Sequence, residues 1–303
     1  EESVCNWYTE EKTDIIISGS NSKMLSSELS TRLSGRYIEI RVHPLSYIEF
    51  LQFHSLENND NSLMLYLTYG GLPGLRRIGI DNDEQVWEYL SSVFNTIMLK
   101  DIIERHSIRN VTFLNNLIEF YADTTGKLTS ATNVSKYMKS QGENISSNLV
   151  LTYREFYTEA FLMSAISRYD IHGKRIFESN EKLYWEDLGL RNLKAPGDME
   201  SYIEKLIENV IYKQLEYLGY EIYVGVLMAG EVDFVCKKPG EKIYIQASYI
   251  IADEDTYKRE FGTLERINDN HPKYVISATP LLKKRDNNGI KHLSLREFLT
   301  NRL

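Results

Sequence analysis

The 303-residue sequence is poor in the residues that build several common kinds of site. It holds two cysteines, Cys5 and Cys236, which are too few and too far apart to predict a zinc site or a disulfide framework, and this favours a reducing setting. No apolar run reaches the roughly 20 residues that span a bilayer, and the N-terminus lacks a signal-peptide pattern. We therefore expect a cytoplasmic protein with no membrane partner.

Basic residues are not in excess either. The formal net charge is -8, with 42% hydrophobic and 26% charged residues, which is an ordinary globular composition. A chain of this length buries a sizeable core and is expected to divide into two or three domains. The charge excludes a uniformly basic nucleic-acid binder, although a local basic face is compatible with it.

A phosphate-binding loop is also absent from the sequence. There is no GxxxxGK[ST] motif and no apolar strand that ends in the acidic pair expected to hold Mg²⁺. The chain by itself is therefore not expected to hydrolyse ATP. It begins with Glu1 rather than Met and runs directly into an apolar stretch, so we expect that an N-terminal portion is missing.

The N-terminal part has a pattern typical of an α/β sheet. Apolar stretches at 14–22 and 36–46 predict two strands, and the leucine-rich sequence between them predicts a helix. Ser46 followed three residues later by Glu49 forms a capping box, which predicts the start of another helix. A strand, helix and strand with short connections imply a parallel pair at the edge of a larger sheet.

The pattern changes in the middle of the chain. Helices are predicted at 113–126, from an N-cap at Thr129 or Ser130 to Met138, and at 145–170, and a hairpin is predicted around Gly173. Three helices with a tight second turn and then a hairpin have the order of a winged helix-turn-helix.

Charge gives this interpretation modest support. The stretch 97–175 holds ten Lys and Arg against eight Asp and Glu, without the basic stripe of a strong DNA binder. In such a module the third helix enters the major groove and the hairpin forms the wing. The predicted nucleic-acid contacts are therefore Ser147 and Arg154 on the third helix, and Lys174 and Arg175 at the tip of the wing. Docking of another protein is the alternative role of such a module.

The last hundred residues predict a helix, a three-stranded meander, a helix, a strand and a final helix. Glu231 and Asp233 lie two residues apart and therefore share one side of their strand, and Gln246 and Ser248 have the same spacing on the next strand. Carboxylate oxygens are the ligands that hold a hard divalent ion and lower the pKa of its bound water. These side chains are therefore candidates for a metal site.

Several motifs, taken in order, resemble those of a group of prokaryotic AAA-type ATPases with a C-terminal domain of unknown function. They are the apolar and GSN segment at 15–51, GGLPG at 70–74, LKDII at 99–103, KLYWEDLGLRN at 182–192, IENVIYKQL at 207–215, EVDFV at 231–235 and IQAS at 245–248. The resemblance covers nearly the whole chain. It implies a mixed α/β (α+β) fold and the C-terminal portion of such an ATPase.

The resemblance also implies a division into domains. Residues 1–53 would be the remnant of the AAA-type core, at the edge of its sheet, and 54–98 a helical lid or connector. Residues 99–195 would form the winged helix, and 196–303 a restriction-endonuclease-like domain of the PD-(D/E)xK type.

Two residues near the N-terminus match nucleotide-sensing positions of that group. Asn21, or Ser20 beside it, resembles the sensor 1 residue that faces the γ-phosphate, and Arg36 resembles an arginine finger that acts in trans. The full-length protein would then bind ATP and Mg²⁺ and form a homo-oligomer through its ATPase core. A turn asparagine and a surface arginine are the alternative, and for the chain by itself no cofactor follows.

In the restriction-endonuclease-like fold, a helix Glu, a strand Asp and an [E/Q]xK pair surround Mg²⁺. Glu208, Asp233 and Gln246 occupy these places in the right order, with Glu208 and Asp233 as the metal ligands. Ser248 stands where the lysine belongs, so a positive charge would have to come from elsewhere, such as Lys258 on the following helix. An active Mg²⁺-dependent nuclease, a degenerate nuclease fold and unrelated surface residues are the three interpretations.

Two classes of function are compatible with these patterns. The first is a nucleic-acid-directed module, with DNA as partner, that serves as effector of an AAA-type ATPase. The second is a protein-interaction or regulatory module in which the same domains bind neither metal nor DNA.

Overall fold

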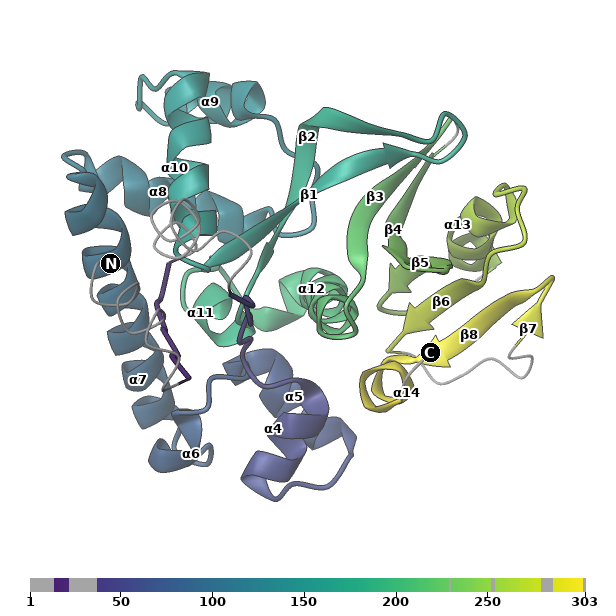
Figure 1. Ribbon diagram of the computed structural model, residues 1–303, viewed down its shortest axis with the longest axis horizontal. Helices are drawn as coiled ribbons and strands as arrows, with labels where there is room; N and C mark the ends of the chain where they lie inside the picture. Colours follow the sequence, from purple (N-terminus) through teal and green to yellow (C-terminus); the bar gives the residue numbers. More distant parts are fainter. Residues whose placement is uncertain (1–13, 22–36, 229, 252–253, 279–285, 302–303) are drawn as a thin grey trace.

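The computed structural model describes residues 14–21, 37–228, 230–251, 254–278 and 286–301. Helices pack around a mixed sheet, which confirms the predicted α/β fold class (Figure 1). The helices are α4 (Tyr47–His54), α5 (Asp60–Tyr69), α6 (Leu75–Ile78), α7 (Asp83–Thr96), the π-helix η1 (Ile97–Glu104), α8 (Val111–Asp123), α9 (Ala131–Ser140), α10 (Ser147–Glu159), α11 (Leu188–Asn192), the 3-10 helix η2 (Met199–Tyr202), α12 (Ile203–Tyr217), α13 (Glu254–Glu265) and α14 (Leu295–Thr300). Within the described ranges no helix is both long enough and apolar enough to cross a bilayer.

Eight strands among the described residues form one sheet, in the order β2-β1-β3-β4-β5-β6-β8-β7. They are β1 (Met163–Asp170), β2 (Arg175–Trp185), β3 (Glu221–Leu227), β4 (Gly230–Lys238), β5 (Glu241–Ser248), β6 (Lys273–Ser277), β7 (Asp286–Asn287) and β8 (Ile290–Ser294). The pairs β1/β3, β5/β6 and β6/β8 are parallel, and the others are antiparallel. The β1–β2 hairpin therefore continues the sheet of the C-terminal strands, across the domain boundary expected at 195/196.

Helices cover both faces of the C-terminal part of the sheet. Phe234 of β4 belongs to the core that α12 and α14 bury, whereas the next residue, Val235, belongs to the core that α13 closes with Phe261 and Leu264. Successive strand residues point to opposite faces, so both faces of this strand are apolar. The sheet is thus the middle layer of three.

Local sequence signals set several helix starts as expected. Ser46 and Glu49 form the predicted capping box at the start of α4. Ser130, one of the two residues proposed for the next cap, accepts a hydrogen bond from the Asn133 N–H at the start of α9. These caps satisfy backbone N–H groups that have no partner within the helix.

Three helices, α8, α9 and α10, precede the β1–β2 hairpin, and a bridge between Thr129 and Glu181 ties the start of α9 to β2. The predicted third helix is too long, because α10 ends at Glu159. Phe161 has a positive φ of 51°, a left-handed conformation that terminates the helix and turns the chain into β1.

The two N-terminal strands are not formed in the described residues 14–21 and 37–46, and this prediction is wrong there. The side chains of Ile16, Ile38 and Val42 are 88–93% exposed. A strand needs hydrogen bonds to a neighbour, and none of the eight strands of the described sheet pairs with these segments. The helix expected between them lies outside the described residues.

Candidate functional site

Three carboxylates converge on the ammonium group of Lys182. Its Nζ lies 2.8 Å from Glu208 Oε1, 2.7 Å from Glu231 Oε1 and 3.2 Å from Asp233 Oδ1. The lysine side chain is 4% exposed, whereas that of Glu231 is 36% exposed. The acidic side chains come from α12 and β4 and the lysine from β2, so this lysine cluster forms where the base of the hairpin meets the sheet and its covering helix.

An irregularity in β4 directs one of these carboxylates. The β3–β4 register shifts by one residue between Val232 and Val235, and the β4–β5 pairing ends at Phe234. Beyond that point Asp233 Oδ2 accepts a hydrogen bond from the Ala247 N–H at 3.0 Å. Because a bulge changes the direction of a strand side chain, Asp233 can leave the regular pleat and reach the ammonium group.

Polar contacts fix α12 against β2 beside the lysine cluster. The Tyr184 hydroxyl donates to Glu208 Oε1 at 2.6 Å, and the Asn209 side chain forms two hydrogen bonds with the Trp185 backbone, at 2.8 and 3.0 Å. The backbone of Gly126 covers the other side of the carboxyl, and a Cβ there would lie 2.8 Å from Glu208 Oε2. With a φ of 74° as well, this position requires glycine.

Burial and charge control protonation in the lysine cluster. Burial raises the pKa of Glu208 to about 7, and the negative charge of Asp233 adds to this effect while Lys182 opposes it. Burial also disfavours the charged lysine, but the surrounding carboxylates outweigh it and raise the pKa of Lys182. One ammonium group thus neutralises only part of the charge of three carboxylates, and Glu208 exchanges its proton near neutral pH.

Mg²⁺, which is expected here from the resemblance to restriction-endonuclease-like domains, does not fit this arrangement. The Lys182 ammonium already occupies the centre that an ion shared by all three acidic residues would take, within 3.2 Å of one oxygen from each. Mg²⁺ requires oxygen ligands at about 2.1 Å in octahedral geometry. The second oxygen of Asp233 is used by the Ala247 N–H.

Other residues predicted for this site lie around the cluster or away from it. Gln246 Oε1 accepts from the Asp233 N–H at 3.4 Å, and its side chain also hydrogen-bonds with Glu260 of α13. Lys258 is 65% exposed and forms an ion pair with Glu254 at 3.2 Å, so the structure does not bring it to the carboxylates.

Lys182 is the member that sequence reasoning missed. It lies within the KLYWEDLGLRN motif, 26 residues before Glu208 and 51 before Asp233. A signal was present, because Lys182 and Tyr184 are two apart in a strand and therefore share one side, and the neighbouring residues are apolar. A charged residue in such a strand calls for a buried partner.

The residues predicted to contact nucleic acid differ in their availability. Arg154 of α10 forms an ion pair with Glu181 of β2, so its guanidinium holds the helix against the hairpin. Ser147 is the first residue of α10, next to the capping Ser146.

The tip of the hairpin is more exposed. Lys174 has a left-handed φ of 52°, and the side chain of Arg175 is 71% exposed. The Arg175 guanidinium lies 5.3 Å from the centre of the Phe177 ring and 3.4 Å from an Asp170 oxygen. Both basic side chains therefore stand at the end of the hairpin, one of them supported by an aromatic ring.

Of the two nucleotide-sensing candidates, Asn21 is fully buried. Beside it, the Ser20 hydroxyl donates to Asp101 Oδ1 of η1 at 2.9 Å, which attaches the GSN turn to the LKDII motif. Arg36 lies outside the described residues.

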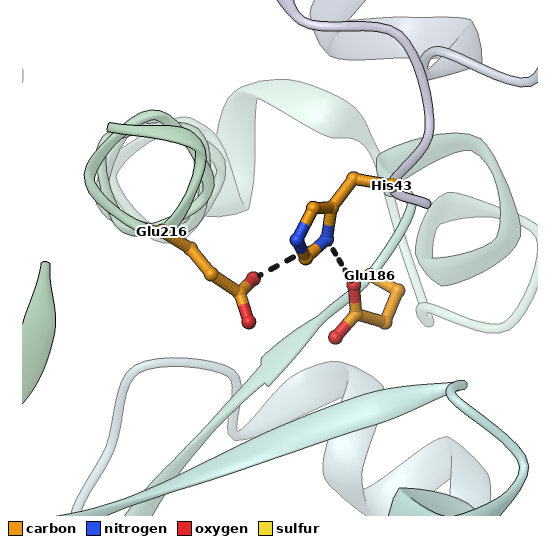
Figure 2. Close-up of side chains that lie close together, drawn as sticks. All are labelled: His43, Glu186 and Glu216. Atoms are coloured by element: carbon orange, nitrogen blue, oxygen red, sulfur yellow. Dashed lines mark ion pairs between the residues drawn. The ribbon is translucent and has the colours of Figure 1, made fainter. Parts of the chain in front are cut away.

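A second group of charges surrounds Glu186, which follows the last residue of β2. Figure 2 shows His43 between Glu186 and Glu216, 3.6 and 3.8 Å from their oxygens. These ligand atoms lie within 4.8 Å of one another, close enough for an ion, but Arg41 and Lys213 each bridge both carboxylates. This bridged cluster therefore contains its own cations.

The bridged cluster has the opposite effect on protonation. Burial would raise the pKa of Glu186, but the hydrogen bond from His43 and the charges of Lys213 and Arg41 lower it to about 2. A surface hollow adjoins the cluster, and its lining includes His43, Glu186 and Lys213 together with Tyr66 and Gly71.

Asp187, the residue after Glu186, holds the GGLPG motif in place. Asp187 accepts hydrogen bonds from the Gly71 N–H at 2.7 Å and from the Leu190 N–H at 3.1 Å, so it joins this turn to the start of α11. Burial raises the pKa of Asp187 to about 6, and these hydrogen bonds act against the increase. The motif is a packed turn.

Comparison with known families places these elements in context. Residues 1–51 match the model of an "AAA domain", and residues 60–200 match a "Domain of unknown function (DUF8612)". The chain is therefore related to AAA-type proteins and carries a domain of unknown function.

Two uncharacterized proteins are similar to this chain. One, from Haemophilus influenzae, is 35% identical over 271 residues, covering 88% of this chain and 66% of the relative. The other, from Methanocaldococcus jannaschii, is 27% identical over 288 residues, covering 88% and 63%. The chain thus spans less than two thirds of either relative, and no solved structure matches it.

Proposed function

We propose that this chain is the nucleic-acid-directed part of an AAA-type ATPase, acting through a winged helix and a degenerate nuclease-like domain. In the full-length protein, an ATPase core with Asn21 and Arg36 as sensor and arginine finger would bind ATP and Mg²⁺ and assemble into a homo-oligomer. The observation that carries the proposal is the exposed pair Lys174 and Arg175 at the tip of a hairpin that follows three short helices.

The order of elements supports the winged helix. Helices α8, α9 and α10 are followed by the β1–β2 hairpin, and the Thr129 bridge to β2 adds a third short pairing, as expected for a wing that packs against its helices. Nothing covers the tip in the described structure: Lys174 and Arg175 are exposed. Phosphate groups are the natural partners of such side chains.

The nuclease-like interpretation is supported by element order and by the acidic side chains. Helix α12, the β3–β4–β5 meander, α13 and β6 follow one another, and Glu208 and Asp233 from the first two elements approach one point. Lys182 occupies that point, which favours a degenerate site over an active one.

The test is binding of a fluorescent DNA duplex at several salt concentrations. Lys174→Ala/Arg175→Ala should weaken binding to a similar extent for unrelated sequences and reduce the slope of log K against log salt by about 2, since two phosphate contacts are lost. The matched control is Arg76→Ala/Lys291→Ala, which removes two exposed basic residues from α6 and β8. It should leave affinity and slope unchanged.

A protein-interaction or regulatory module is the second candidate. The ion pair between Arg154 and Glu181 favours it, because one predicted DNA contact is already engaged within the protein. Unchanged DNA affinity and slope in a folded wing variant would reject the nucleic-acid proposal in favour of this one.

A further inference from the structure

We infer that the ammonium group of Lys182 takes the place of the divalent ion in the nuclease-like site, so that this site is a permanent ion-pair cluster that binds no metal. The inference builds on the nuclease-like part of the proposed function. It concerns metal binding and stability, so its outcome is independent of whether the wing binds DNA.

Geometry is the first argument. The Lys182 Nζ lies 2.7 to 3.2 Å from one oxygen each of Glu208, Glu231 and Asp233, so one ammonium group forms ion pairs with all three carboxylates. The contacts with Glu208 and Asp233 are hydrogen bonds, and the contact with Glu231 is an ion pair. The lysine side chain is 4% exposed, so its ammonium group is enclosed by these carboxylates and is not open to solvent.

Displacement of the lysine is the second argument. A metal ion bound by these oxygens would leave a buried ammonium group without partners, which is strongly unfavourable. Lys182 also has little freedom to withdraw, because Leu183 and Trp185 beside it are buried and Asn209 holds the Trp185 backbone through both its N–H and its C=O.

The site also accounts for Ser248. Its side chain is buried and its backbone pairs with Ser277 of β6, so a lysine there would need a buried partner of its own. With the positive charge supplied from β2, β5 needs no lysine. One explanation thus covers both the serine at position 248, where the nuclease pattern has a lysine, and the lysine at position 182.

The decisive experiment compares the wild-type chain with Lys182→Met, which removes the charge and keeps an unbranched side chain of similar length. Each is titrated with Mn²⁺ and Mg²⁺ by calorimetry, and thermal unfolding is followed with either ion or with EDTA. We expect no binding and an unchanged Tm for the wild type. Lys182→Met should bind Mn²⁺, and its Tm with Mn²⁺ should be about 4 °C or more above its own Tm with EDTA.

Lys182→Met/Asp233→Asn is the matched control, because it removes one proposed ligand from the opened site. It should lose the Mn²⁺ response of the single variant. Two results would overturn the inference. One is that the wild type binds Mn²⁺ and Asp233→Asn abolishes this binding; the other is that Lys182→Met folds but binds no ion.

If Lys182→Met does not fold, Asp233→Asn in the wild-type background still decides the matter. In an ion-pair cluster, EDTA leaves the wild-type Tm unchanged and Asp233→Asn lowers Tm equally with and without EDTA. A wild-type Tm that EDTA reduces to the level of Asp233→Asn would show that a metal holds the site.

Discussion

The lysine cluster contains Lys182 and the bridged cluster contains Glu186, four residues further along the chain, and the two clusters differ in charge balance. The first sets one cation, Lys182, among three carboxylates. The second sets Arg41, Lys213 and His43 around two carboxylates. The pKa values follow: Glu208 in the first is raised to about 7, and Glu186 in the second is lowered to about 2.

This difference shows that similar groups of acidic residues respond to pH in opposite directions. Glu208 holds a proton more tightly in the folded protein than its ordinary pKa of 4.5 allows, so its contribution to stability is complete below about pH 4.5 and is lost as pH rises through 7. Glu186 contributes above about pH 4.5 and loses its contribution as pH falls toward 2. Both carboxyl groups are buried, and the number of nearby cations decides whether the pKa is raised or lowered.

The largest effect is expected from Lys182→Met. Removing the one cation leaves three carboxylates facing one another, and breaking a buried pair in this way costs about 3–5 kcal/mol. The loss in the free energy of unfolding should be larger near pH 8 than near pH 5.5, because Glu208 is protonated at the lower pH. Urea denaturation at both pH values measures it, and an equal loss at both would contradict the unbalanced charge.

Glu208→Gln should remove a pH dependence. Between about pH 5 and pH 8 the wild type should lose about 3 kcal/mol of stability through this group, since each unit of pKa shift is worth about 1.4 kcal/mol. The variant should lack this slope. Glu204→Gln, on the exposed side of the same helix, is the control and should retain it. Parallel slopes in wild type and Glu208→Gln would refute the raised pKa.

The bridged cluster should lose its contribution to stability in acid. Glu186→Gln is expected to cost about 2 kcal/mol near neutral pH, with the difference from wild type vanishing as pH falls toward 2, where the wild-type carboxylate is protonated as well. Denaturation curves from about pH 7 to pH 2 test this. A cost that persists in acid would mean that packing, and not charge, is what Glu186 provides.

The smallest effect on stability is expected at the wing. Lys174→Ala/Arg175→Ala alters exposed side chains, so the free energy of unfolding should stay within about 0.5 kcal/mol of wild type. Thermal unfolding measures this, and the same result makes the variant a valid probe of DNA binding. A larger loss would show that the Arg175 contact with Phe177 supports the hairpin.

Much of the local structure follows from sequence patterns alone. Ser46 with Glu49 marks the start of α4, and the order of α12, the three-stranded meander and α13 matches the apolar periodicity. The strands expected at 14–22 and 36–46 are not formed in the described residues of these segments. Alternating apolar residues form a strand only where another strand supplies hydrogen-bond partners.

The sequence by itself determined the residue types of the candidate site and their order, since the two-residue spacing of Glu231 and Asp233 puts both on one side of a strand. Only the tertiary structure decided what lies between them. Lys182 comes from a hairpin 51 residues upstream of Asp233, carried into the same sheet by the parallel pairing of β1 with β3. Sequence periodicity shows which side of its own element a residue occupies, whereas the partner across a buried contact depends on how the elements pack.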